Sequence, residues 1–187
     1  MELTAKYVLD VVRAFRTAYV MKVVEHTRSG GVSPNEDWKS DSHFIPLPAQ
    51  FVKEAAVQLE SFDVGLIGLT PLNPLNAPRT PAETDALIQL MKNRERPVRT
   101  FIDGDYFKAI SADLALVQSC VDCHNHHPKA VHRDFKRWDV MGGLVVRFKL
   151  GTTRPEGLSI GPDPARRPAS PLEKMTPPQT VPPPWVP

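Results

Sequence analysis

The amino-acid sequence predicts an α+β fold in which long helices come first and an antiparallel sheet follows. Residues 4–27 contain neither glycine nor proline, and their apolar side chains recur at helical spacing. In the second half of the chain the apolar stretches are short, and two of them flank Asp103-Gly104, a pair typical of tight hairpin turns. These signals place the helices before the sheet.

Three helices are expected, each from a different signal. Residues 4–27 form the first, and the second begins at Pro48, because proline is favoured at the first helical position. The third covers residues 81–92, since Thr80-Pro81-Ala82-Glu83 is a capping box. The buried face of the first helix is expected to hold Val8, Val12, Phe15, Tyr19, Val23 and His26, and that of the second Phe51, Ala55, Leu59 and Phe62.

Short apolar runs predict the strands of the sheet. They lie at residues 64–69, 98–102, 106–110, 114–117 and 143–150. After the first strand, residues 70–78 contain three prolines, which remove backbone donors and fix the backbone, so this segment is expected to be a structured loop.

The chain divides into a folded domain at residues 1–150 and a proline-rich tail at residues 151–187. From Pro155 onward, the tail holds 11 of the 20 prolines. Such a composition favours extended segments and cannot form a packed core.

Charge and hydropathy argue against a nucleic-acid interface and against a membrane span. The formal net charge of +2 is spread along the chain without a basic block, so no nucleic-acid interface is expected. No run approaches the roughly 18 to 20 apolar residues that span a bilayer, so no membrane span is expected in this chain. The N-terminus has no basic region followed by an apolar core, and we expect any export signal to have been removed or to lie outside this chain.

Both cysteines of the chain fall in one motif, Cys120-Val121-Asp122-Cys123-His124. In a Cys-x-x-Cys-His sequence each thiol can add to one vinyl group of haem, and the adjacent imidazole can coordinate the iron from one side. The expected cofactor is therefore one covalently bound c-type haem. Cys120 and Cys123 would hold it, and His124 would be the proximal iron ligand.

The cysteine pair allows three other interpretations. A zinc site could recruit His126 or His127, but no second cysteine pair or finger-like histidine pair accompanies it. A thioredoxin-type redox pair would need a βαβ context and a following helix, whereas Pro128 follows closely here. A disulfide or a purely structural pair is the third, and haem is preferred over all three.

Further residues join the motif in a wider pattern. His126-His127-Pro128 follows the motif, and Arg133-Asp-Phe-Lys-Arg-Trp-Asp-Val-Met-Gly-Gly143 comes next. This run resembles the signature of a bacterial family of single-haem c-type proteins with a PAS-like fold. That family was first described as a domain of unknown function, and it includes a cyanobacterial haem protein and haem-bearing sensor regions of histidine kinases. Residues 45–51 and 71–78 are similar to two further family segments.

The resemblance implies a PAS-like domain with haem packed between the antiparallel sheet and the preceding helices, in an exported or periplasmic setting. It implies thioether roles for Cys120 and Cys123 and the proximal ligand role for His124. Some members of the family look to supply an early cysteine as the second axial ligand. Because this chain has no cysteine outside the motif, thiolate ligation is excluded.

Two side chains of the first helix are candidates for the sixth iron ligand. At 100° per residue His26 falls within the apolar arc, whereas Met21 projects near the opposite side. A vacant or water-filled sixth site is the alternative. Tyr19 is expected to be a core residue whose hydroxyl reaches one partner.

Basic residues after the motif are candidate partners for the haem propionates. Arg133 and Arg137, with Lys136 and Arg147, could form charge-assisted hydrogen bonds to carboxylates. The alternative is a solvated basic loop.

The sixth ligand decides between two functions. A six-coordinate haem would make the chain a redox carrier that exchanges electrons with a partner protein. An open or displaceable sixth site would make it a sensor that binds a small gaseous ligand. The carrier is preferred because no output domain accompanies the haem domain, and no catalytic constellation predicts an enzyme. A periplasmic or other extracytoplasmic location is expected, because c-type haem is normally attached outside the cytoplasm.

Overall fold

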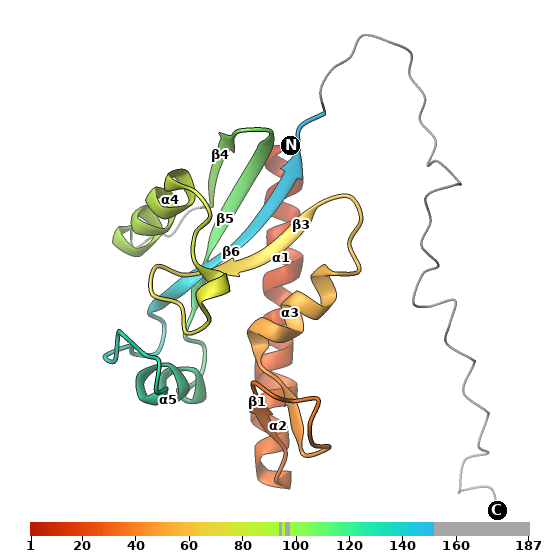
Figure 1. Cartoon of the computed structure of the whole chain (residues 1–187), viewed down its shortest axis with the longest axis vertical. Helices are drawn as coiled ribbons and strands as arrows, with labels where there is room; N and C mark the ends of the chain where they lie inside the picture. The colour runs from red at the N-terminus through yellow and green to blue at the C-terminus, as the bar shows by residue number, and fades with distance from the viewer. Residues whose placement is uncertain (94, 96–97, 152–187) are drawn as a thin grey trace, which may run out of the picture. The chain divides into compact units, whose positions relative to one another are not determined.

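The computed structural model describes residues 1–93, 95 and 98–151 (Figure 1). Its helices are α1 (Glu2–Ala18), the π-helix η1 (Tyr19–Val24), α2 (Glu25–Thr27), η2 (Arg28–Gly30), α3 (Pro48–Ala56), η3 (Pro74–Asn76), α4 (Pro81–Lys92) and α5 (Gln118–His126). Its strands are β1 (Ser33–Asn35), β2 (Phe44–Pro46), β3 (Asp63–Ile67), β4 (Arg99–Asp103), β5 (Tyr106–Leu114) and β6 (Val140–Lys149). The α+β class is confirmed. The predicted tail lies outside the described residues except for Gly151.

Four strands form one antiparallel sheet in the order β3-β6-β5-β4. The hairpin expected at Asp103-Gly104 joins β4 to β5, and Gly104 takes the left-handed backbone conformation (φ 57°) that glycine allows. In the register of β6, Ile67 at the end of β3 pairs with Gly143, and Leu114 at the end of β5 pairs with Val140. The ends of β3 and β5 and the start of β6 therefore lie together at one edge of the sheet.

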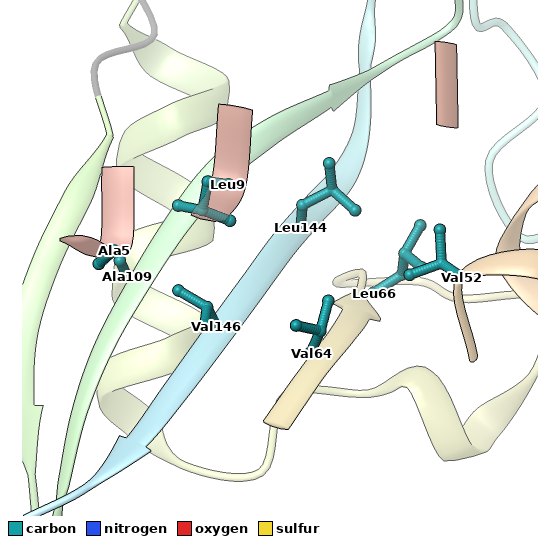
Figure 2. Packing of buried hydrophobic residues seen from close by; sticks show 8 residues of the cluster. All are labelled: Ala5, Leu9, Val52, Val64, Leu66, Ala109, Leu144 and Val146. Carbon is teal, nitrogen blue, oxygen red and sulfur yellow. The ribbon is translucent and has the colours of Figure 1, made fainter. Parts of the chain in front are cut away.

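The sheet is covered by helices on both faces. Successive strand residues point to opposite faces, and they divide the core into two clusters. One cluster joins α1 and α3 to the sheet through Ala5, Leu9, Val52, Val64, Leu66, Ala109, Leu144 and Val146 (Figure 2). The other joins α4 to the opposite face through Ile67, Ala86, Leu87, Leu90, Ile110 and Val145. No helix in the described part of the chain combines the length and apolar character needed to cross a bilayer.

The first helix forms as expected but buries a different face. Its buried residues are Ala5, Leu9 and Arg16, continued in η1 by Tyr19, Val20 and Val24. Phe15 is 65% exposed and Val23 is 36% exposed, so this part of the predicted face was wrong. Residues 19–24 form a π-helix, whose hydrogen bonds span five residues instead of four. A projection at a constant 100° per residue cannot follow the face through such a turn, which accounts for Val23 but not for Phe15, since Phe15 precedes the turn.

Several other elements differ from the expectation, and the short strands β1 and β2 were not predicted. Helix α3 ends at Ala56, so Leu59 and Phe62 lie beyond it, and Val52 is its buried residue. The predicted strand at 114–117 is wrong, because β5 stops at Leu114 and α5 begins at Gln118. Helix α5 itself was not predicted.

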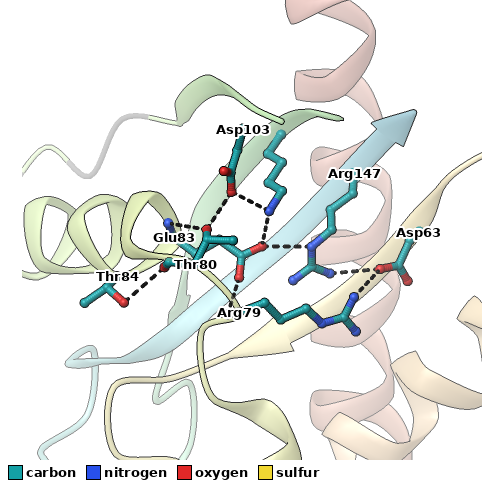
Figure 3. A network of polar contacts seen from close by, with 8 residues as sticks. Asp63, Arg79, Thr80, Glu83, Thr84, Asp103 and Arg147 are labelled. Atoms are coloured by element: carbon teal, nitrogen blue, oxygen red, sulfur yellow. Dashed lines mark hydrogen bonds and ion pairs between the residues drawn. The ribbon is translucent and has the colours of Figure 1, made fainter. Parts of the chain in front are cut away.

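The Thr80 side chain caps the start of helix α4, and Glu83 has a second role (Figure 3). The return bond of the expected capping box differs, because the Glu83 carboxylate accepts from the Arg79 N–H at 2.7 Å instead of from the Thr80 N–H. The backbone N–H of Glu83 donates to the Thr80 hydroxyl at 3.3 Å. The Glu83 carboxylate is fully buried and accepts from Lys108 Nζ and Arg147 Nε, both at 2.9 Å. Arg147 also donates to Asp63 at 2.9 Å. The proposal of Arg147 as a propionate partner was wrong, because this network lies on the α4 face of the sheet.

Candidate functional site

A cavity of about 920 Å³ lies at the sheet edge where β3 and β5 end and β6 begins. Its wall is formed by the last turns of α1 with η1, the start of α3, the loop after β3, and α5. The cavity falls within the size range of cofactor sites. Val20 and Val24 of η1 and Leu66 of β3 give it apolar wall surface.

Helix α5 brings the cysteine motif to the cavity wall. Cys120 and Cys123 are three residues apart and His124 follows four residues after Cys120, so the three side chains share one side of the helix. All three line the cavity, and both thiols are free. Two thiols beside one imidazole on an apolar wall form the donor set that a c-type haem needs.

Three contacts hold α5 in place. The Ser119 hydroxyl donates to Glu25 Oε1 at 2.6 Å, which ties the start of α5 to α2. At the other end, the Asn125 side chain donates to the Phe135 carbonyl at 2.9 Å and accepts from the Phe135 N–H at 3.0 Å. The Phe135 ring also lies edge-on to the His124 imidazole, with centroids 5.9 Å apart. The loop after α5 therefore supports the ring of His124.

The surroundings of α5 favour the uncharged forms of the ligands. Burial lowers the pKa of His124 below 6.5, and the electrostatic influence of Arg16 and His127 lowers it further. The neutral imidazole that results at pH 7 is the form that binds a metal. Partial burial raises the pKa of the Cys123 thiol above 9.0 even though the residue as a whole is exposed, and Cys120 and Glu36 add to this effect.

A buried ion pair completes the wall. Arg16 and Asp113 both line the cavity, and Arg16 Nη2 lies 3.0 Å from Asp113 Oδ1. The Arg16 side chain is 6% exposed and its Nε has no hydrogen-bond partner in the described part of the chain. Burial raises the pKa of Asp113 above 3.8, while the charge of Arg16 opposes this rise. A buried polar atom without a partner is uncommon and calls for a further group at the site.

Neither predicted sixth ligand lies in the cavity wall. His26 is exposed in α2, and Met21 is 47% exposed in η1. The residues that this part of the chain presents to the cavity are Arg16, Val20, Val24 and Arg28. Iron ligation by His26 or Met21 stays a prediction, and neither side chain lines this cavity. For His26, which follows η1, the π-helical turn accounts for the difference from the projected face. Tyr19 is a core residue as expected: its hydroxyl donates to the Pro46 carbonyl at 2.6 Å, and its ring stacks on Phe51.

The predicted propionate partners also lie outside the cavity wall. Arg133 is exposed and donates to the Asn125 carbonyl at 3.1 Å. Arg137 is exposed, donates to the Leu116 carbonyl at 3.4 Å and lies over the Trp138 ring. Both arginines therefore brace the loop after α5, and Arg16 and Arg28 are the arginines that line the cavity.

Sequence reasoning missed three cavity residues. Arg16 lies between the apolar residues of α1, and its sequence position gave no sign that it lines a cavity. The same holds for Met141 of β6. Asn76 lies in the segment of residues 70–78 that was expected to be a structured loop. Asn73 does cap η3 through a 3.0 Å bond from the Leu75 N–H, but Asn76 lines the cavity with a buried Oδ1 that has no partner among the described residues.

Comparison with known proteins places the chain in a family. The model of the family described as "Tll0287-like: Tll0287" matches residues 1–148, which is most of the chain. The chain belongs to the Tll0287-like family. The resemblance drawn from the sequence is thereby confirmed, and the Tll0287-like match covers the whole described fold except its last residues.

A solved structure shows the same fold. The crystal structure of the cyanobacterial heme-protein Tll0287 superposes with a TM-score of 0.52 at 19% sequence identity. The superposition covers 77% of this chain and 95% of that chain. No match was found among curated protein sequences. In the part of the chain that the structure describes, no three His, Cys, Asp or Glu side chains gather as a metal site, and a structural zinc site needs four such ligands.

Proposed function

We propose that the chain binds one c-type haem covalently through Cys120 and Cys123, with His124 as the proximal iron ligand, and that it carries electrons. The observation that carries the proposal is the position of all three side chains on one wall of a single cavity. The choice of cofactor is supported by Tll0287, a heme-protein of the same fold. The haem supplies the redox chemistry, since its iron changes oxidation state by one electron.

The residues of the chain would position the cofactor and keep water from it. Helix α5 presents the two thiols and the imidazole on one side, so one helix would supply both attachment points and the proximal ligand. Val20, Val24 and Leu66 would contact the apolar ring. Burial of the ring raises its preference for the less charged ferrous state and so contributes to the reduction potential.

Arginines of the cavity wall are better placed than those of the loop to bind the propionates. Arg28 lines the cavity and is about half exposed, and Lys53 of α3 lines it too. Arg16 offers its unpaired Nε deeper in the wall. We infer that these side chains replace Arg133 and Arg137 as partners of the haem carboxylates.

Binding of a small gas is the second candidate function. It is favoured by one observation: η1 presents only the side chains of Val20 and Val24 to the cavity, and neither can coordinate iron. If no other element supplies a ligand, the sixth position stays open to carbon monoxide or nitric oxide. The carrier would instead exchange electrons with a partner protein.

The proposed setting is the periplasm or another extracytoplasmic compartment. It rests on the Cys-x-x-Cys-His motif, because c-type haem is normally attached outside the cytoplasm. Fusing the chain to an export signal in a bacterium with haem-attachment machinery, and omitting that signal in a matched strain, tests the dependence. Covalent haem is expected only in the exported chain, and equal attachment in both strains would contradict the proposed setting.

Carbon monoxide separates the two functions. The haem-loaded chain is reduced with dithionite, and its absorption spectrum is recorded before and after carbon monoxide is added. A carrier is expected to show an unchanged spectrum and a reversible one-electron wave in voltammetry. A spectrum that shifts at micromolar gas concentration would reject the carrier and support the sensor.

A further inference from the structure

Met141 occupies a break in the sheet beside the cavity. Strands β5 and β6 stay paired as far as Asp113 with Gly142, and the next pair is Leu114 with Val140. Met141 is therefore an extra residue of β6 that has no partner on β5. Such an insertion is a β-bulge. Bulges turn a side chain away from the direction that the regular strand would give it, and they occur beside functional sites. Met141 is partly buried and lines the cavity.

The chain enters this bulge through a strained backbone position. Trp138 has φ 73°. In the described part of the chain, no other residue except glycine has a positive φ. Its N–H donates to the Ala115 carbonyl at 2.8 Å, and the Ala115 N–H donates to the Asp139 carbonyl at 3.0 Å. These two bonds hold the segment in place just before Met141. A bulky residue in the left-handed region is sustained only where surrounding contacts impose it.

Besides His124, the cavity wall holds three His or Lys side chains: Lys53 of α3, assigned above to the haem carboxylates, and His127 and Lys129, which follow the proximal histidine in sequence. His127 and Lys129 come three and five residues after His124, at the end of α5 and in the loop that follows. A sixth ligand has to approach the iron from the face of the ring opposite His124. Side chains of the same short segment as His124 are poorly placed for that approach.

The carboxylates of the wall have other partners. Glu36 Oε1 lies 3.3 Å from His127, Asp113 is paired with Arg16, and Asp122 accepts from Gln118 within α5. Charged oxygen ligands are also a poor match for a buried haem iron that passes through the ferrous state.

Met141 has the right chemistry and comes from a separate element. Its thioether is neutral, soft and polarizable, and a His–Met pair is the ligand set that raises the reduction potential in cytochromes c. We propose that Met141 of β6 is the sixth iron ligand, opposite His124. This inference rests on the haem site proposed above. It favours electron transfer over gas binding, because a methionine on the iron closes the sixth position.

The test compares three haem-loaded full-length chains: the wild type, Met141→Leu and Met21→Leu. Leucine keeps the volume of methionine but has no sulfur. Met21→Leu is the matched control, since Met21 is 47% exposed and does not line the cavity. In the ferric wild type and the control we expect the weak long-wavelength band of sulfur–iron charge transfer. In Met141→Leu we expect loss of that band, a lower reduction potential, and binding of carbon monoxide to the ferrous iron.

Two results would overturn the assignment. One is a Met141→Leu chain that keeps the band, the potential and the inertness to carbon monoxide of the wild type. The other is read from the wild type alone, in case the variant does not fold: proton spectra of the reduced protein should contain one methionine methyl signal shifted far upfield by the haem ring current. Its absence overturns the proposal. A wild type that carries no covalent haem would instead reject the haem site itself, so the two failures are distinguishable.

Discussion

Arg16 Nη2 lies 3.0 Å from Asp113 Oδ1, in a buried ion pair that joins α1 to β5 in the wall of the proposed haem cavity. The two residues are 97 positions apart in sequence (113 minus 16), so the pair links the first helix to the end of β5. Its two members differ in one respect. A buried carboxyl can become neutral by binding a proton, whereas a guanidinium stays charged.

The first prediction concerns this difference between the carboxyl of Asp113 and the guanidinium of Arg16. Asp113→Asn leaves the buried charge of Arg16 without compensation and is expected to lower the free energy of unfolding by about 3 to 5 kcal/mol. Arg16→Met is expected to cost less, because burial already raises the pKa of Asp113 and the acid can take up a proton. Urea unfolding followed by circular dichroism measures both. Asp10→Asn, in the exposed pair of Asp10 and Arg13, should change little, and equal losses in the two buried variants would contradict the explanation.

The second prediction concerns acid stability and the network in Figure 3. Burial raises the pKa of Glu83, but hydrogen bonds from Arg147, Arg79 and Lys108 outweigh it and the net pKa lies below 4.5. A carboxylate whose pKa is lower in the folded state stabilises the fold above its unfolded pKa, and this contribution is lost as the pH falls through the folded pKa. Stability should therefore decline below about pH 4.5.

Glu83→Gln tests this assignment. The variant should be less stable at pH 7 by about 3 to 5 kcal/mol, because Lys108 and Arg147 lose a buried counter-charge. It should also show a shallower loss of stability between pH 5 and about pH 3. Glu54→Gln, in an exposed pair with Lys39, is the control and should follow the wild type. An unchanged acid slope in Glu83→Gln would show that other carboxylates set it.

The third prediction tests how closely the sheet packs on α4. A Cβ at Gly143 would lie 2.7 Å from Ile110 Cγ2 and 2.9 Å from Leu87 Cδ2, both in the core cluster on this face. Gly143→Ala should therefore cost about 1 to 3 kcal/mol through overpacking. Gly151→Ala meets no atom within 4 Å and should stay within about 0.5 kcal/mol of the wild type. Thermal unfolding compares them, and equal melting temperatures would contradict the packing described.

The fold could be predicted from the sequence wherever the signal is local. The capping box at Thr80 places the start of α4, and the Asp103-Gly104 turn places the β4–β5 hairpin. Helix α5 escaped prediction because serine, cysteine, aspartate, histidine and asparagine make up most of it, and these residues have modest helix propensity. Tertiary contacts hold this helix, such as the bond between Ser119 and Glu25.

The site could be predicted only in part for a similar reason. Because Cys120, Cys123 and His124 lie within five consecutive residues, their motif could be identified from the sequence alone. The rest of the cavity wall comes from distant segments: Arg16 from α1, Asn76 from η3 and Met141 from β6. The π-helical turn and the bulge are both departures from regular spacing, and periodicity cannot reveal them.

The central claim is that Cys120 and Cys123 hold a haem covalently. Its most direct measurement is the intact mass of the full chain, exported in a host with haem-attachment machinery and denatured in acid and organic solvent before mass spectrometry. We expect a wild-type mass equal to the polypeptide plus one haem, and a haem-free mass for the double variant Cys120→Ser, Cys123→Ser. A wild-type chain with the mass of the polypeptide alone would contradict it.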